Sequence, residues 1–292
     1  MSDFENAIEI KGLTKKYDGY TLDHISFSVP KGTIMGFVGQ NGAGKSTTIK
    51  AILHIINADE GEVKLLGMDY LKDERKIKEQ TAVVFDEMPF HESFTPEALN
   101  KVFRGFFESW DEERFLSLLE RFQLPRKKKI GKFSKGMKMK LQIATALAHD
   151  AKLLIMDEAT TGLDPIVRSE MLDVFREYLQ DENRSILMSS HITSDLEKIA
   201  DGLTFIDKGR ILLTGSKDEI LEMHGVIKCT REDLSQIDGE NIVSIRINDF
   251  GAEVMVKDRY AVKKKYPKLL VERTNLEEIM LFYVNQGKKE WS

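Results

Sequence analysis

The residues best suited to chemistry lie in the segment GQNGAGKST, residues 39–47. Its spacing, G-x-x-x-x-G-K-S, is typical of loops whose backbone N–H groups converge on phosphate oxygens, with a lysine for the β- and γ-phosphates and a serine for Mg²⁺. The alternative is a chance match, but an apolar strand pattern before the loop and a helical pattern after it supply the required context. We therefore predict that the phosphates are bound by Gly39, Gln40, Asn41, Gly42, Ala43, Gly44, Lys45, Ser46 and Thr47.

A second candidate is the acidic pair that ends the apolar segment LLIMDE, residues 153–158. Such a run predicts a buried strand, and ligands bind at the carboxyl ends of strands in open α/β sheets. Asp157 is placed to hold Mg²⁺, and Glu158 is placed to polarise an attacking water as a general base. The alternative is a solvated acidic pair on an edge strand, and the presence of the phosphate loop makes this alternative the less favoured one.

These residues need a sheet to position them, and the hydrophobic pattern predicts one. Alternating segments between residues 8 and 32 indicate an antiparallel layer, whereas uniformly apolar segments at 33–39, 151–158 and 184–191 indicate buried parallel strands. Residues of about 95–149 have helical spacing. We predict an α/β fold with a mixed sheet core, an antiparallel β layer and this helical insertion in residues 1–220, followed by a small α+β domain in residues 221–292.

The bulk composition narrows the class of protein. The 292 residues carry a net charge of −5. The stretch from Arg126 to Lys140, which is basic and has no acidic residue, is therefore a local feature, and the acidic net charge weakens a nucleic-acid-binding interpretation without excluding it. Cys229 is the only cysteine, which excludes an internal disulfide and fits a reducing compartment. The N-terminus has no apolar core typical of a secretory signal, and no apolar run approaches the roughly 20 residues that cross a bilayer.

Together the phosphate loop and the acidic pair resemble the ATP-binding subunit of an ABC transporter, of P-loop NTPase fold, with matches from residue 8 to about 220. In that family a signature segment, usually Leu-Ser-Gly-Gly-Gln, starts a helix and binds the γ-phosphate held by another subunit. Here FSKGM would fill that role, with Ser134 and Gly136 facing phosphate. Phe133, Lys135 and Met137 depart from the commonest form, and the sequence leaves open whether Lys135 faces phosphate or water.

The resemblance assigns further roles. It implies that Asp164, in TGLD, lies near a dimer seam, that His191 contacts the γ-phosphate, and that Tyr17 stacks on adenine. The position of the family's Q-loop glutamine falls at Asp86, or at Glu87 one residue later. Since a carboxylate accepts hydrogen bonds but cannot donate as an amide does, we predict that Asp86 contributes to Mg²⁺ or water coordination.

The resemblance also implies the biological setting. We expect an ATPase that uses ATP and Mg²⁺, closes on ATP as a homodimer or heterodimer, and powers an integral membrane permease, with an exporter of the Gram-positive antimicrobial-peptide or peptide-toxin type as the nearest branch. Its place would be the cytoplasmic face of the cell membrane. The aromatic residues of VFRGFFESW, residues 102–110, either form a core stripe or line a groove for a permease helix. The alternatives are a soluble ABC ATPase acting on nucleic acid or ribosomes, or a small-molecule kinase; we expect no nucleic-acid partner.

Overall fold

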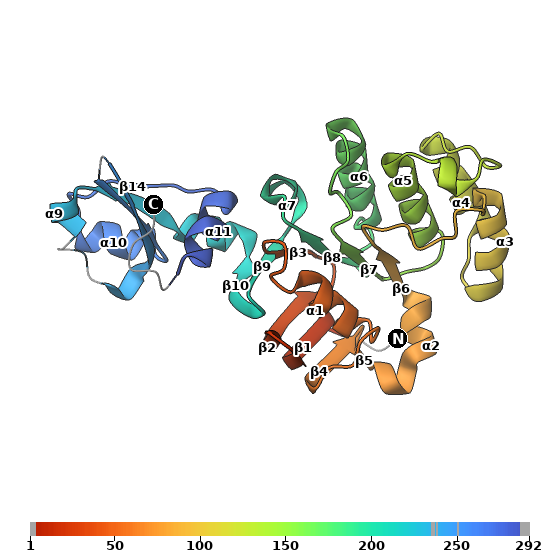
Figure 1. Cartoon of the computed structure of the whole chain (residues 1–292), viewed down its shortest axis with the longest axis horizontal. Coiled ribbons are helices and arrows are strands. Elements are labelled where there is room, and N and C mark those ends of the chain that lie inside the picture. The colour runs from red at the N-terminus through yellow and green to blue at the C-terminus, as the bar shows by residue number, and fades with distance from the viewer. Residues whose placement is uncertain (1–3, 235–236, 238, 250, 287–292) are drawn as a thin grey trace.

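Three β-sheets and their covering helices make up the structure, a computed structural model that describes residues 4–234, 237, 239–249 and 251–286 (Figure 1). The first sheet is antiparallel, with the strand order β2-β1-β4-β5. Along its two long strands buried and exposed positions largely alternate, because one face packs on the core and the other meets solvent. This confirms the predicted antiparallel layer. The bounds are β1 Asn6–Tyr17, β2 Tyr20–Pro30, β4 Glu60–Leu65 and β5 Met68–Asp69.

The second sheet is the core of the fold and has the order β10-β9-β3-β8-β7-β6. Strands β3, β7 and β8 are buried at every position and run parallel to their neighbours, which confirms the three buried strands that the apolar runs predict. Only β10, at the edge, is antiparallel. The bounds are β3 Ile34–Val38, β6 Thr81–Val84, β7 Leu153–Asp157, β8 Ser185–Ser190, β9 Gly202–Asp207 and β10 Arg210–Ser216.

Helices cover this sheet, and those between β6 and β7 form the predicted helical insertion. Between β6 and β7 lie α3, α4, a 3-10 turn η1 and α5; side-chain caps from Thr95, Asp111 and Ser134 begin the three α-helices. The bounds are α1 Lys45–Ile52, α2 Tyr70–Gln80, α3 Pro96–Phe106, α4 Glu112–Arg121, η1 Ile130–Lys132, α5 Lys135–Ala146, α6 Pro165–Tyr178 and α7 Thr193–Ile199.

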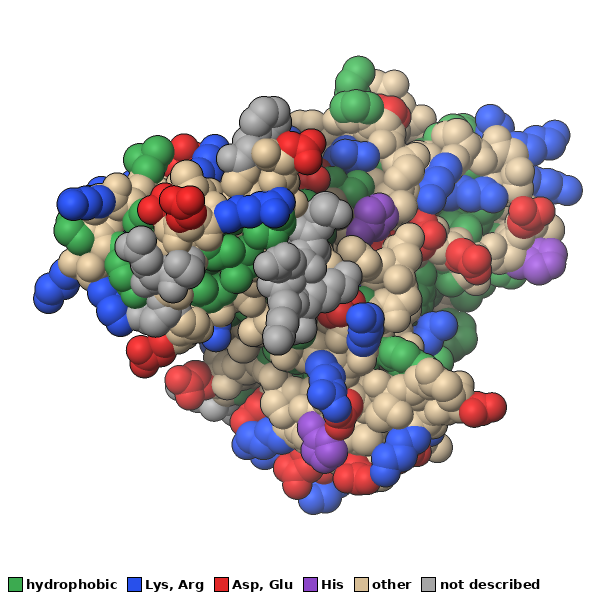
Figure 2. Space-filling view, turned by 60° about the vertical axis from the view of Figure 1, so that its left-hand side comes forward, with side chains coloured by type: hydrophobic (Ala, Val, Ile, Leu, Met, Phe, Trp, Pro, Cys, Tyr) green, Lys and Arg blue, Asp and Glu red, His purple; other side chains and the backbone are tan. Residues whose placement is uncertain are grey.

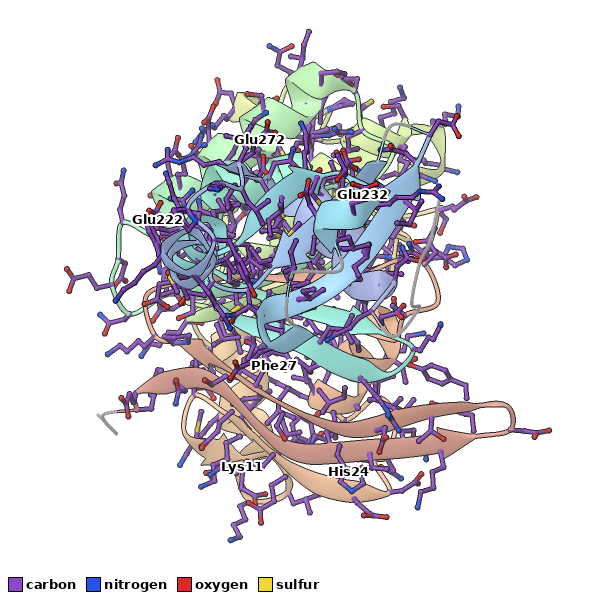
Figure 3. The ribbon with its side chains drawn as sticks, turned by 90° about the vertical axis from the view of Figure 1, so that its left-hand side faces the viewer. Lys11, His24, Phe27, Glu222, Glu232 and Glu272 are labelled. Carbon is purple, nitrogen blue, oxygen red and sulfur yellow. The ribbon has the colours of Figure 1, made fainter. Side chains whose placement is uncertain are left out.

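The C-terminal part has a third, four-stranded antiparallel sheet with the order β12-β13-β11-β14, which faces the viewer in Figure 3. The predicted boundary near residue 220 falls inside α8. The two parts share one apolar cluster: Leu276, Ile279 and Phe282 of α11 are buried together with Leu196 of α7 and Phe205 of β9. The bounds are α8 Lys217–Met223, β11 Gly225–Cys229, α9 Arg231–Leu234, η2 Gly239–Asn241, β12 Ile242–Asn248, β13 Gly251–Val256, α10 Arg259–Lys265, β14 Val271–Glu272 and α11 Leu276–Val284.

Within the described ranges, no helix is both long enough and apolar enough to span a bilayer.

Candidate active site

The predicted phosphate loop connects the C-terminal end of β3 to the N-terminus of α1. Gly44 caps the helix at φ 118°, in the left-handed region that favours glycine, and a Cβ there would collide with the Tyr20 hydroxyl. The Lys45 ammonium is 5% exposed and donates to the carbonyl oxygens of Gly39 at 2.6 Å and Gln40 at 3.1 Å. The loop therefore curls around its own lysine, beside the positive end of a helix.

The rest of the loop lies open at the surface. Asn41, Gly42 and Ser46 are exposed, and Thr47 is half-buried, whereas Ala43 is buried. Ser46 is thus exposed at the start of α1, where the N-terminal end of a helix favours an anion.

The acidic pair stands at the end of β7, beside β8. Asp157 is 8% exposed and accepts a hydrogen bond from the Ser189 hydroxyl at 2.7 Å. The backbone N–H of Glu158 donates to Ser189 Oγ at 3.0 Å. The parallel register, which places Asp157 opposite Ser189, creates this contact. Sequence reasoning missed Ser189, although its place two residues before His191 on a buried strand is a usable signal.

Glu158 joins the phosphate loop to His191. One carboxylate oxygen lies 2.9 Å from Lys45 Nζ; the other lies 2.6 Å from His191 Nδ1 and accepts from the Thr161 hydroxyl at 2.7 Å. Burial by itself raises the pKa of this carboxyl, but the bonds from Lys45, Thr161 and His191 outweigh it, so the Glu158 pKa lies below its usual value. The carboxylate is therefore ionised at neutral pH, as a general base must be.

The signature residues and the TGLD segment, residues 161–164 and called the D-loop from here on, lie at the starts of two neighbouring helices. Ser134 Oγ accepts from the Met137 N–H at 3.2 Å at the start of α5, and Asp164 caps α6 by accepting from Ile166 and Val167. A Cβ on Gly136 would meet only Val167, at 3.8 Å. The Ser134 and Asp164 side chains thus close the first turns of their own helices, and both residues are exposed.

Two predicted residues have neighbours that the sequence did not indicate. Tyr17, at the end of β1, is 45% exposed, and its ring centroid lies 6.4 Å from that of Tyr20, whose hydroxyl is 3.4 Å from the Ala43 carbonyl. Asp86, after β6, is ion-paired with Lys135 of the signature at 2.9 Å. Lys135, for which the sequence leaves open a phosphate-facing or a water-facing position, is thus paired with a carboxylate of its own chain.

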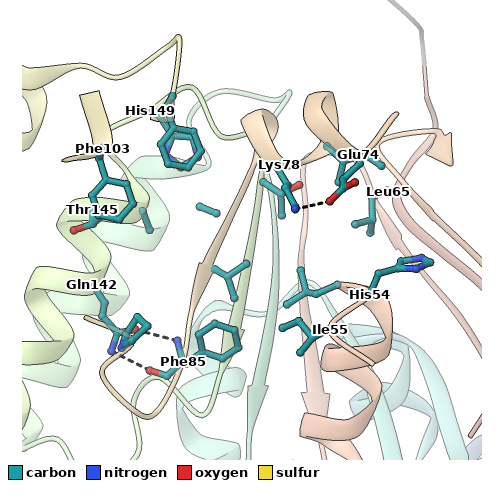
Figure 4. A pocket seen from close by; sticks show the side chains of 18 of the residues that line it. His54, Ile55, Leu65, Glu74, Lys78, Phe85, Phe103, Gln142, Thr145 and His149 are labelled. Carbon is teal, nitrogen blue, oxygen red and sulfur yellow. Dashed lines mark hydrogen bonds and ion pairs between the residues drawn. The ribbon is translucent and has the colours of Figure 1, made fainter. Parts of the chain in front are cut away.

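An apolar groove of about 600 Å³ lies between α1, α2, β6 and the helical insertion (Figure 4). Phe103 and Phe107 line it together with Phe85 and His149, while Trp110 stacks on Phe103 at 5.4 Å and donates to Asn100. The exposed fraction of Phe106 is 74%. The aromatic stripe therefore serves both as packing and as a groove wall.

Similarity to known proteins agrees with this geometry. The sequence profile of the family described as "ABC transporter" matches residues 22–161. The bacitracin transport ATP-binding protein BcrA of Bacillus licheniformis is 35% identical over 209 residues, which cover 70% of this chain and 68% of that protein. The lantibiotic transport ATP-binding protein SrtF of Streptococcus pyogenes is 34% identical, covering 72% and 91%, respectively.

Two further similarities extend the comparison. The ABC transporter ATP-binding protein YtrB of Bacillus subtilis is 28% identical over 97% of this chain and 100% of its own length. A solved ATP-binding subunit of an ABC transporter superposes with a TM-score of 0.66 at 30% identity, covering 73% of this chain and 91% of that one. The chain therefore belongs to the ABC transporter family, as an ATP-binding subunit that hydrolyses ATP.

Proposed function

We propose that ATP is cleaved at the loop of residues 39–47, with Glu158 as general base and with Lys45 and His191 facing the γ-phosphate. The contact of Glu158 with both Lys45 and His191 carries this proposal. A γ-phosphate offers the Lys45 ammonium a second anion, so nucleotide binding would free the carboxylate to accept a proton from water. Tyr17, with Tyr20 behind it, would stack on the adenine.

We further propose that Mg²⁺ accompanies ATP, held by Ser46 and Asp157 with a contribution from Asp86. Hydroxyl and carboxylate oxygens are the ligands that Mg²⁺ prefers, and Ser46 is exposed at the end of the phosphate loop. When bound, the ion would neutralise negative charge on the β- and γ-phosphates. Ser189 would orient Asp157 through their 2.7 Å hydrogen bond.

The second half of the ATP site would come from another copy of this chain or from a related subunit. Ser134, which is exposed, and Gly136 lie at the N-terminal end of α5, and Asp164 caps α6 beside Ile166, a large apolar residue that is 81% exposed. An isolated exposed isoleucine is common, but its position beside the D-loop suits a surface that is covered on dimer closure. ATP would then lie between the phosphate loop of one copy and Ser134 of the other.

The membrane partner would dock at the apolar groove in Figure 4. Its aromatic walls fit the apolar face of an amphipathic helix from a permease, and Ile55, 56% exposed, is among its lining residues. Docking would keep the subunit at the cytoplasmic face of the cell membrane. Because BcrA and SrtF are named for bacitracin and lantibiotic transport, we propose that the transporter exports an antimicrobial peptide or a similar toxic compound.

The lysines of α5, in the second half of the basic stretch, give no support to a nucleic-acid function. Lys135, Lys138 and Lys140 are paired with Asp86, Glu92 and Glu170, respectively. On the face shown in Figure 2, lysine and arginine side chains are interspersed with aspartate and glutamate. Internal pairing reduces the positive potential available to a phosphate backbone.

The test of the shared site is the Glu158→Gln variant. It keeps the shape of the side chain but removes its basicity, so we expect ATP hydrolysis to fall by about 100-fold or more. ATP should accumulate uncleaved and yield a dimer in light scattering coupled to gel filtration. Glu113→Gln, on the exposed face of α4, serves as the matched control. A Glu158→Gln chain that stays monomeric with ATP, or that hydrolyses it at the normal rate, would refute the proposal.

A further inference from the structure

Three separate segments of the chain meet at the side chain of Lys135, the first residue of α5. Its ammonium forms the 2.9 Å ion pair with Asp86, which follows β6. Its stem passes over Gly162 in the D-loop: a Cβ added to Gly162 would lie 3.2 Å from Lys135 Nζ and 3.7 Å from Cε. One side chain therefore contacts the loop after β6 and the D-loop while belonging to the signature.

Two hydrogen bonds from a buried side chain reinforce the contact between α5 and the loop after β6. Gln142, two turns further along α5 and 3% exposed, accepts from the Phe85 N–H and donates to the Phe85 carbonyl, both at 3.1 Å. Phe85 also lines the apolar groove. Residues 85–86 are thus held to α5 at two points, a buried one at Gln142 and an exposed one at Lys135.

Helix stability does not account for Lys135. The first turn of α5 has no acidic residue, and a cation there meets the positive end of the helix dipole. The Lys135 and Asp86 side chains are 49% and 46% exposed, and ion pairs so open to solvent add little to the free energy of unfolding. The contact is well suited to being broken and remade when an anion such as phosphate approaches.

We infer that Lys135 is a positioning residue: its ion pair with Asp86 keeps Ser134 and Gly136 aligned with the D-loop and with the groove wall. The inference rests on the proposed function, because it assigns the aligned residues to the partner's ATP. It also gives Asp86 a role that needs no metal ion.

A double-mutant cycle tests this role. Lys135→Met and Asp86→Asn should each lower kcat about three- to tenfold, the double variant should lose no more than either single one, and the reversed pair Lys135→Asp/Asp86→Lys should recover most of the loss. The Kd of the monomeric chain for ATP, measured by isothermal titration, should stay within about twofold, because the phosphate loop is untouched. Lys101→Met, which removes an exposed lysine paired with Glu97 on α3, is the control and should leave kcat unchanged.

A second measurement separates this inference from the shared site. In the Glu158→Gln background, Lys135→Met should raise the ATP concentration needed for dimerisation at least about threefold. Additive losses, or normal kcat in both single variants, would overturn the inference. So would an Asp86→Asn variant with altered Mg²⁺ dependence beside a normal Lys135→Met variant, because Asp86 would then act on the metal alone. If Glu158→Gln itself gave no dimer with ATP, the shared site would fail, whatever the cycle showed.

Discussion

Glu158 and Lys45 illustrate how much of this site depends on single side chains. The carboxylate is 14% exposed and the ammonium 5%, so each is the main counter-charge of the other in the absence of nucleotide. Removing either one leaves a buried charge with less compensation, which costs more than the loss of an exposed pair. The folded chain therefore depends on these two charges as a pair.

Lys45→Met tests the binding role at this scale. The variant keeps the length of the side chain and loses its charge-assisted hydrogen bonds, so the affinity for ATP should fall about 10- to 100-fold. Isothermal titration with ATP measures this directly. Lys50→Met, at an exposed position of the same helix, should bind as the parent chain does. Normal affinity in the Lys45 variant would exclude contact with phosphate.

The low pKa of Glu158 predicts a dependence of stability on pH. A carboxyl whose pKa falls on folding stabilises the native state above its unfolded pKa, near 4.5, and loses that contribution as the pH drops through its lower folded value. The free energy of unfolding of the parent chain, minus that of Glu158→Gln, should therefore shrink as the pH falls below 4.5. Urea unfolding of both chains at pH 6 and pH 4 measures the difference; a difference that grows on acidification would contradict the assigned direction.

At the scale of elements, a helix N-terminus can stabilise the fold through its cap or can also bind a ligand, and the sequence pattern of a cap does not distinguish these two roles. Ser134 and Asp111 both cap helices of the insertion through one backbone N–H. The cap at Ser134 opens towards the proposed partner, whereas the cap at Asp111 starts α4, away from the phosphate loop. Under the proposed function, the cap at Ser134 would serve both ATP binding and folding, and the cap at Asp111 would serve folding alone.

Ser134→Ala and Asp111→Ala separate these roles. Each should lower the free energy of unfolding by about 1 kcal/mol, the usual cost of losing a helix cap. Only Ser134→Ala should also reduce ATP hydrolysis beyond what the lost stability explains. Chemical denaturation and steady-state ATPase assays on the two variants provide both numbers. Equal effects on hydrolysis would mean that Ser134 acts only as a cap.

At the scale of the whole molecule, the C-terminal part is anchored close to His191 in the sequence, at α7. Helix α7 begins two residues after His191, and its Glu197 accepts from the Leu276 N–H at 2.8 Å at the start of α11. Lys217 also donates to the Glu197 carbonyl at 2.9 Å. Since Leu276 and Phe282 are fully buried against the main core, the C-terminal part completes that core.

Deleting residues 225–292 should therefore destabilise the remaining chain rather than leave it unaltered. The deletion exposes apolar side chains of α7 and β9, so the melting temperature should fall and binding of a hydrophobic dye should rise. Leu276→Ala is the matched milder change, with an expected cost of about 2–5 kcal/mol. Differential scanning fluorimetry of the three chains tests this; an unchanged melting temperature after deletion would show that the parts fold independently.

The fold class and the phosphate loop can be predicted from the amino-acid sequence alone. Apolar runs must be buried, alternation must face one side of a sheet, and the spacing of residues 39–47 has few other uses, so local pattern was sufficient. The positions of Asp157 and Glu158 can be predicted in the same way, because they follow an apolar run that forms a buried strand and lie at its carboxyl end. The register that brings Ser189 to Asp157 was not readable, since strand pairing is a long-range property.

The pairing of charges and the extent of the core follow from the packing of distant elements. The sequence leaves open whether Lys135 faces phosphate or water, and its partner Asp86 lies 49 residues away in the sequence. Lys138 and Lys140 likewise pair with distant acids, Glu92 in the loop before α3 and Glu170 on α6. Nor did local pattern show that α11 completes the main core. Such contacts depend on which elements become neighbours, and that follows from packing the whole chain.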